Sequence, residues 1–136
     1  MTPNLVELWL KYAQDDLNSA SVLLREGIYN MVCFHSQQAV EKVLKSIIAH
    51  YRMEIPRTHN LIRLQGICEN LSGEKLEIDD GKLMFLNDVY IDSRYPADFG
   101  LLPGGQSTET DARKAYVSAD TIFKYLRSLL AGLQKK

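Results

Sequence analysis

Apolar residues recur along most of the chain at intervals of three and four, the spacing typical of helices that bury one face. The first such run extends from Pro3 to Leu24 and includes Leu5, Leu8, Trp9, Tyr12, Leu17, Ala20 and Leu23. Thr2 is its expected N-cap, because a threonine hydroxyl can accept from a helix N-terminal amide. Gly27 interrupts the pattern, and a second run follows after residues 26–28. So short a connection predicts an antiparallel helical hairpin.

Proline and threonine residues set the expected ends of the next helices. The second helix should end at Pro56, because the residue before a proline is disfavoured in the helical region. Thr58 then offers its hydroxyl as the N-cap of a third helix. Residues 72–81 are polar and include two glycines, which is typical of a loop. A fourth helix follows and should end before Pro96.

The last part of the chain predicts one connection and one long helix. Residues 100–107 are rich in glycine and proline and should form an exposed connection. Thr108 or Thr110 can cap the final helix, whose apolar stripe continues to Leu130. No segment predicts a strand. The sequence therefore predicts an all-α fold of about five helices in a single domain, residues 1–136, with the first, second and last helices supplying most of the core.

Composition narrows the class of protein. The 136 residues are 46% hydrophobic and 24% charged, which is typical of a globular chain. The net charge of -1 provides no overall field that would attract nucleic acid or anionic lipid, so any phosphate binding must be local. Cys33 and Cys68 are far apart and form no metal-type motif. With no leader and no apolar run approaching a membrane span, a cytoplasmic protein is expected.

Several kinds of chemistry lack their usual residues. The three histidines, His35, His50 and His59, show no HExxH pair or other metal-ligand spacing, so no metal is expected. No glycine-rich segment has the pattern of a nucleotide-binding loop, and no cofactor is expected. Asp15 and Asp16 are adjacent on a helix and point about 100° apart, which is poor geometry for paired catalytic carboxylates. Asp16 is expected to be a partly buried hydrogen-bonding residue.

A polar stripe follows one line along the second helix. It comprises His35, Gln38, Lys42 and Lys45, at offsets of three, four and three. One interpretation is a solvated face with an ion pair between Glu41 and Lys45. The other is that the stripe contacts a second helix or a ligand.

The end of the fourth helix places a guanidinium beside an aromatic ring. Arg94 can contact a phosphate with two donors, and Tyr95 offers a face on which a base can stack. Together they suit a nucleotide or an unpaired base. The alternative is that Arg94 pairs with an acidic neighbour while Tyr95 packs in the core.

Four segments together resemble the HEPN domain. They are Ala13, Asp16, Leu17, Ala20, Leu23 and Leu24, then Cys33 to Lys42 with its QQAVEK core, then Thr58 to Leu61, and finally Arg94 to Pro96. The resemblance spans nearly the whole chain. It implies an up-and-down helical bundle related to the C-terminal domain of kanamycin nucleotidyltransferase, commonly a homodimer. Small prokaryotic members are often encoded beside a minimal nucleotidyltransferase, and such pairs include toxin–antitoxin systems.

The resemblance also implies a chemistry, from which this sequence departs. Many members are metal-independent ribonucleases in which an arginine is followed, after four to six residues, by a histidine. Arg94 aligns with that arginine, but residues 99–101 are Phe, Gly and Leu. Arg52 and His59 have the required spacing, although they fall in the connection between the second and third helices.

These observations lead to one main hypothesis and two alternatives. The main one is a HEPN module that dimerises and binds a nucleotide, RNA or a nucleotidyltransferase partner through Arg94, Tyr95 and the surface of His35, Gln38 and Lys42. The first alternative is a ribonuclease toxin in which His59 or His35 supplies the proton-transfer group beside Arg94. The second is a structural helical adaptor. The catalytic residues are left open, with Arg94, His59 and His35 as candidates.

Overall fold

The computed structural model describes residues 4–94 and 106–135, and five helices lie within them. They are α1 (Leu5–Glu26), α2 (Tyr29–His50), α3 (Leu61–Ser72), α4 (Asp80–Arg94) and α5 (Glu109–Gln134). Neither range contains a strand, so the all-α prediction is confirmed. Thr2, Pro3, Tyr95, Pro96, Lys136 and most of the predicted connection at 100–107 lie outside the described residues.

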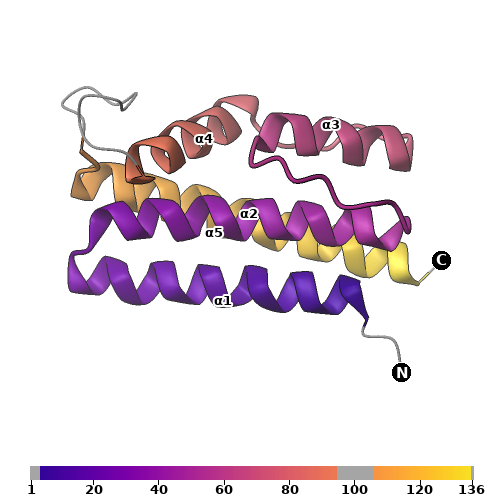
Figure 1. Cartoon of the computed structure of the whole chain (residues 1–136), viewed down its shortest axis with the longest axis horizontal. Helices are drawn as coiled ribbons and strands as arrows, with labels where there is room; N and C mark the ends of the chain where they lie inside the picture. The colour runs from indigo at the N-terminus through magenta and orange to yellow at the C-terminus, as the bar shows by residue number, and fades with distance from the viewer. Residues whose placement is uncertain (1–3, 95–105, 136) are drawn as a thin grey trace.

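Helix α2 is the centre of the bundle (Figure 1). Helices α1 and α5 run beside it along their full lengths, while α3 and α4 follow one another along its other side. The prediction that the first, second and last helices supply most of the core is confirmed, since most of the buried apolar residues lie on α1, α2 and α5. Helix α1 contributes the fewest of the three, because it is an outer helix. It buries Ala13, Leu17 and Ala20, whereas Leu5, Leu8 and Tyr12 remain 55%, 36% and 51% exposed.

The hairpin of α1 and α2 forms where the sequence predicts it. Gly27 adopts a φ of 77°, a left-handed conformation that favours glycine, and its amide donates to the carbonyls of Leu23 and Leu24. The N-cap prediction for α1 is wrong. Asn4 caps the helix, because its side-chain oxygen accepts from the amide of Glu7.

The predicted end of α2 and the predicted cap of α3 are also wrong. Helix α2 ends at His50 rather than near Pro56, because the chain turns at Arg52, whose φ is 60°. Asn60, not Thr58, caps α3, since its side-chain oxygen accepts from both the Ile62 and Arg63 amides. The Thr58 hydroxyl instead accepts from the amide of Asn60 and shapes the approach to the helix.

Helix α5 begins with a complete capping box. The hydroxyl of Thr108 accepts from the amide of Asp111, and the Asp111 carboxylate accepts from the amide of Thr108. Of the two predicted caps, Thr108 is therefore the residue used.

No helix among residues 4–94 and 106–135 combines the length and apolarity needed to cross a membrane.

Candidate functional site

A buried carboxylate on α2 organises the first part of the site. Glu41 accepts from the Lys45 ammonium at 2.9 Å, and its other oxygen accepts from Nδ1 of His59 at 2.8 Å. The side-chain amide of Gln38 donates to that same oxygen at 3.1 Å. Gln37 donates to the carbonyl of His59 at 2.7 Å. These bonds fix the segment before α3, and the His59 ring in particular, against the middle of α2.

A second carboxylate, on α1, organises the other histidine. Asp16 accepts from the Lys42 ammonium at 2.6 Å and from Nδ1 of His35 at 2.8 Å. The Asp16 side chain is nearly buried, whereas those of Lys42 and His35 are about one-quarter exposed. The prediction of a partly buried, hydrogen-bonding Asp16 is confirmed. The two carboxylates therefore tie α1 and the start of α3 to opposite sides of α2.

The predicted polar stripe of α2 is a set of interhelical contacts rather than a solvated face. Gln38 and Lys45 are buried, and the Lys45 ammonium lies 5.6 Å from the centre of the Trp9 ring on α1. The predicted pair of Glu41 and Lys45 is present, but inside the protein. The interpretation as a solvated face is wrong, because α2 is surrounded by the other helices.

Tyr90 brings the remaining candidates together. Its ring stacks on Phe34 at 5.7 Å between centroids and lies 5.4 Å from the ring of His59. Its hydroxyl accepts from a guanidinium nitrogen of Arg94 at 3.0 Å, one helical turn further along α4. We refer to Phe34, His59, Tyr90 and Arg94 as the Tyr90 cluster. Segments from α2, the α2–α3 connection and α4 contribute to it.

The two predicted histidines differ in their relation to this cluster. His59 belongs to it and is half exposed. His35 reaches it only through Phe34, whose ring it meets edge-on at 5.1 Å. Arg52 lines a different pocket, with Asn4 and Met53, so the Arg52–His59 spacing does not bring those two side chains into one pocket.

A small cleft lies against the Tyr90 cluster. It has a volume of about 170 Å³ and is lined by His59, Asn60, Asn87, Tyr90 and Ile91. The side chain of Asn87 accepts from the Leu61 amide and donates to the side-chain oxygen of Asn60. Sequence reasoning missed Phe34, Asn87 and Tyr90 as parts of the site. The spacing of Tyr90 and Arg94, four residues apart on one helix, was the available signal.

The site can combine charge stabilisation with proton transfer. A histidine held at Nδ1 by a carboxylate presents Nε2 outward, which is the arrangement of a general acid or base. Arg94 is exposed and has a fixed positive charge suited to a phosphate. Among the described residues, no group of three or more His, Cys, Asp and Glu side chains could hold a metal ion.

Thiol chemistry does not suit either cysteine. Burial raises the pKa of Cys33 to about 11 and that of Cys68 to about 12. Both residues are buried and unpaired with one another, as expected from their positions in the sequence. Because the thiolate is the nucleophilic form, neither side chain is activated for catalysis.

The fold and the site define a small helical-bundle protein in which a carboxylate on the central helix holds His59 and a carboxylate on α1 holds His35. The chain belongs to the HEPN domain family, whose model matches residues 6–130. The residues of the QQAVEK and THNL segments, on which the resemblance depends, are those that build the Glu41 hydrogen bonds.

The chain is also similar to individual proteins along most of its length. The chain is 29% identical over 137 aligned positions to a protein of Methanocaldococcus jannaschii named "Putative toxin MJ1304", covering 91% of this chain and 87% of the relative. The crystal structure of TT1696 from Thermus thermophilus superposes with a TM-score of 0.71 at 27% identity, covering 93% of this chain and 98% of that one. The structure of ST0689, an archaeal HEPN homologue, has a TM-score of 0.66 at 24% identity over 95% and 98% of the two chains and shows the same fold.

Proposed function

We propose that the protein is the RNA-binding, toxin-type component of a two-component system and that it binds RNA at the Tyr90 cluster. The observation that supports this most directly is that Tyr90 contacts both His59 and Arg94. The His59 ring suits the base of an unpaired nucleotide, and the Arg94 guanidinium suits its phosphate. The name of the M. jannaschii relative supports the toxin assignment.

Three members of the cluster, Arg94, His59 and Tyr90, have separate parts in this proposal. Arg94 contacts the phosphate with charge-assisted hydrogen bonds. His59, with half of its side chain exposed, offers the ring on which a base stacks. Tyr90 is almost buried and therefore positions the other two. Tyr95, which follows Arg94 directly, remains a predicted ligand contact. Gln38 and Lys42 act through the carboxylates that they hold.

Binding is tested with short fluorescently labelled single-stranded RNA, followed by anisotropy. Arg94→Ala should weaken binding by about 1 to 3 kcal/mol, because a charge-assisted contact is lost. Arg127→Ala is the matched control, since it removes an equal charge from the exposed surface of α5. Equal binding by the wild type and Arg94→Ala would contradict the proposal. Arg94→Lys should restore binding only in part, because a lysine lacks the planar fork of donors.

Ribonuclease activity is the second candidate function, and the hydrogen bond between Glu41 and His59 favours it. In this case Nε2 of His59 transfers a proton while Arg94 stabilises the phosphate charge. Single-stranded RNA incubated with the protein and a chelator would be cleaved by the wild type, and His59→Gln would abolish cleavage. If the RNA binds but is not cleaved, the result supports RNA binding without ribonuclease activity. If the RNA is neither bound nor cleaved, the structural adaptor is the function that remains.

The family resemblance also supports two partners. We expect a homodimer, which sedimentation at micromolar concentration tests, and a clean monomer would exclude a site shared by two chains. We expect a minimal nucleotidyltransferase encoded beside this gene, in the cytoplasm where both thiols remain reduced. Co-expression with that neighbour should relieve any growth arrest that the chain causes alone. Growth arrest by wild type but not by Arg94→Ala would connect toxicity to the Tyr90 cluster.

A further inference from the structure

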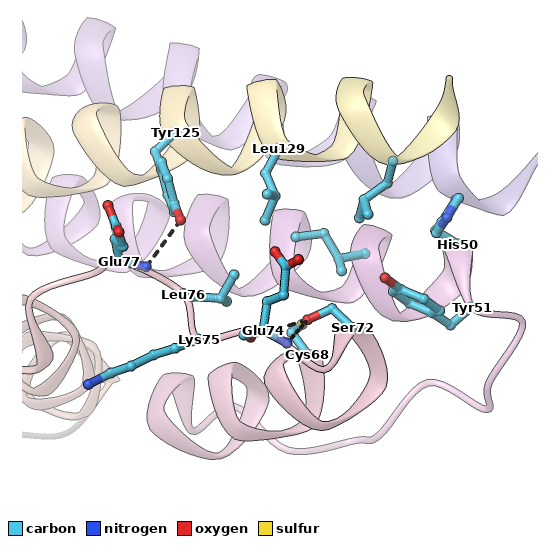
Figure 2. Close-up of a pocket in the computed structure, with 12 residues that line it drawn as sticks. His50, Tyr51, Cys68, Ser72, Glu74, Lys75, Leu76, Glu77, Tyr125 and Leu129 are labelled. Carbon is cyan, nitrogen blue, oxygen red and sulfur yellow. Dashed lines mark hydrogen bonds between the residues drawn. The ribbon is translucent and has the colours of Figure 1, made fainter. Parts of the chain in front are cut away.

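A larger pocket lies away from the Tyr90 cluster, among the C-terminal ends of α2, α3 and α5 (Figure 2). Its volume is about 430 Å³, within the range of small-molecule sites. The connection between α3 and α4, residues 73–79, forms one wall. None of its lining residues belongs to the Tyr90 cluster or to the smaller cleft.

Hydrogen bonds hold this wall in place. The amide of Leu76 donates to the Glu69 carboxylate at 2.7 Å, and the Leu76 side chain is buried. The amide of Glu77 donates to the hydroxyl of Tyr125 on α5 at 3.1 Å, as Figure 2 shows. The Ser72 hydroxyl accepts from the amide of Glu74. The pocket is therefore formed before any ligand arrives, which lowers the entropic cost of binding.

The pocket has an apolar interior and a polar edge, to which Glu74, Lys75 and Glu77 belong. Ile47, Leu76 and Leu129 supply apolar surface. Figure 2 shows the Glu74 carboxylate and the Tyr51 hydroxyl directed into the pocket, while the Lys75 side chain extends away from it. Within the described part of the chain, the Glu74 carboxylate and the Tyr51 hydroxyl have no hydrogen bond or ion pair.

We propose that this pocket binds a small organic cation, namely a protonated amine on an aromatic or alkyl body. The amine would meet the Glu74 carboxylate and the Tyr51 hydroxyl, while the body fills the space beside Leu76 and Leu129. Tyr51 and Tyr125 also line the pocket, and aromatic rings attract cations. An anion is disfavoured, because the carboxylate points inward and the lysine points outward. This ligand site is separate from the RNA-binding proposal and stands without it.

The test uses two compounds with the same ring and opposite charge, tryptamine and indole-3-acetate. Titration of ¹⁵N-labelled full-length protein should shift the amide signals of Tyr51, Leu76 and Glu77 with tryptamine but not with indole-3-acetate. Glu74→Gln should weaken tryptamine binding by about tenfold, the change expected when one charge-assisted contact is lost. Glu26→Gln is the charge-matched control: Glu26 is the last residue of α1 and does not line the pocket, so this variant should bind tryptamine as the wild type does.

A second variant keeps the test independent of charge. Leu129→Trp fills the pocket from partly exposed surface on α5 and should abolish tryptamine binding, with circular dichroism confirming the helical fold. Equal binding of the two compounds, or unchanged binding by Glu74→Gln, would overturn the assignment of a cation. No shift of these amides at millimolar tryptamine would overturn the site itself.

Discussion

The carboxylate of Glu41 accepts a hydrogen bond from Nδ1 of His59 at 2.8 Å and so connects the middle of α2 to the residue that precedes the cap of α3. This bond joins the buried polar interior of the bundle to an exposed surface, because Glu41 is nearly inaccessible while the His59 side chain is half exposed. The position of the His59 ring is thus set by α2 rather than by its own loop. The stability of the fold and the geometry of the Tyr90 cluster depend on the same carboxylate.

Replacing Glu41 by Gln should destabilise the protein by about 3 to 5 kcal/mol, because the buried Lys45 ammonium would lose its counter-charge. Urea unfolding followed by circular dichroism measures the change in the free energy of unfolding. Asp15→Asn is the control. It breaks an exposed pair with Lys11 on α1, which should cost at most about 1 kcal/mol. Equal effects of the two substitutions would mean that the Lys45 charge is accommodated without Glu41.

The helices themselves could be predicted from the sequence, because the apolar period alone specifies helices that bury one face. Their precise ends could not. At α3, Thr58 and Asn60 are both good caps, and the choice of Asn60 depends on Asn87 of α4, which binds the same side-chain oxygen. At α2, the turn at Arg52 precedes the proline that the sequence favours as the end of the helix.

The residues of the candidate site could be predicted only in part. Arg94 and His59 stand out by their chemistry, but Tyr90 has the spacing of an ordinary core residue and is indeed almost buried. Only the packing of α4 on α2 shows that Tyr90 lies between Arg94 and His59 and contacts both. The burial of Gln38 and Lys45 was hidden as well, since a polar stripe has the same sequence pattern whether water or another helix faces it. The likeness to kanamycin nucleotidyltransferase stays a prediction.

Two glycines should respond in opposite directions to substitution by alanine. Gly27→Ala should destabilise the protein by about 1 kcal/mol, because its φ of 77° strains any residue with a Cβ. Gly66→Ala, inside α3, should stabilise it by about 0.5 to 1 kcal/mol, since a Cβ there meets no atom within 4 Å. Thermal melting of the two variants beside the wild type measures both. Destabilisation by Gly66→Ala would show that α3 tolerates no added volume at that position.

The capping box of α5 predicts a difference between two neighbouring threonines. Thr108→Ala should cost about 0.5 to 2 kcal/mol, because the Asp111 amide loses its side-chain acceptor. Thr110→Ala should be close to neutral, since alanine is a good helix former and this position lies inside α5. Chemical unfolding of the pair gives the comparison. Equal losses in the two variants would contradict the assignment of Thr108 as the cap.

The buried thiols predict that stability falls as the solution becomes alkaline. Burial raises the pKa of Cys33 from 9.0 to about 11 and that of Cys68 from 9.0 to about 12. Above pH 9, thiols in the unfolded chain lose their protons while those in the folded protein keep them. The unfolded state then binds fewer protons, so the free energy of unfolding decreases with rising pH, by about 1.4 kcal/mol per pH unit for each thiol.

Alanine variants isolate this contribution from the lysines and tyrosines that also titrate at high pH. Cys68→Ala should be less stable than the wild type at pH 7.5, because it leaves a small cavity. The difference between the two proteins should then shrink between pH 9 and 11, since the variant no longer has that thiol to ionise. Urea unfolding of both proteins at pH 7.5, 9, 10 and 11 measures this difference in the free energy of unfolding. A difference that stays constant across these values would show that ionisation of Cys68 is not coupled to unfolding.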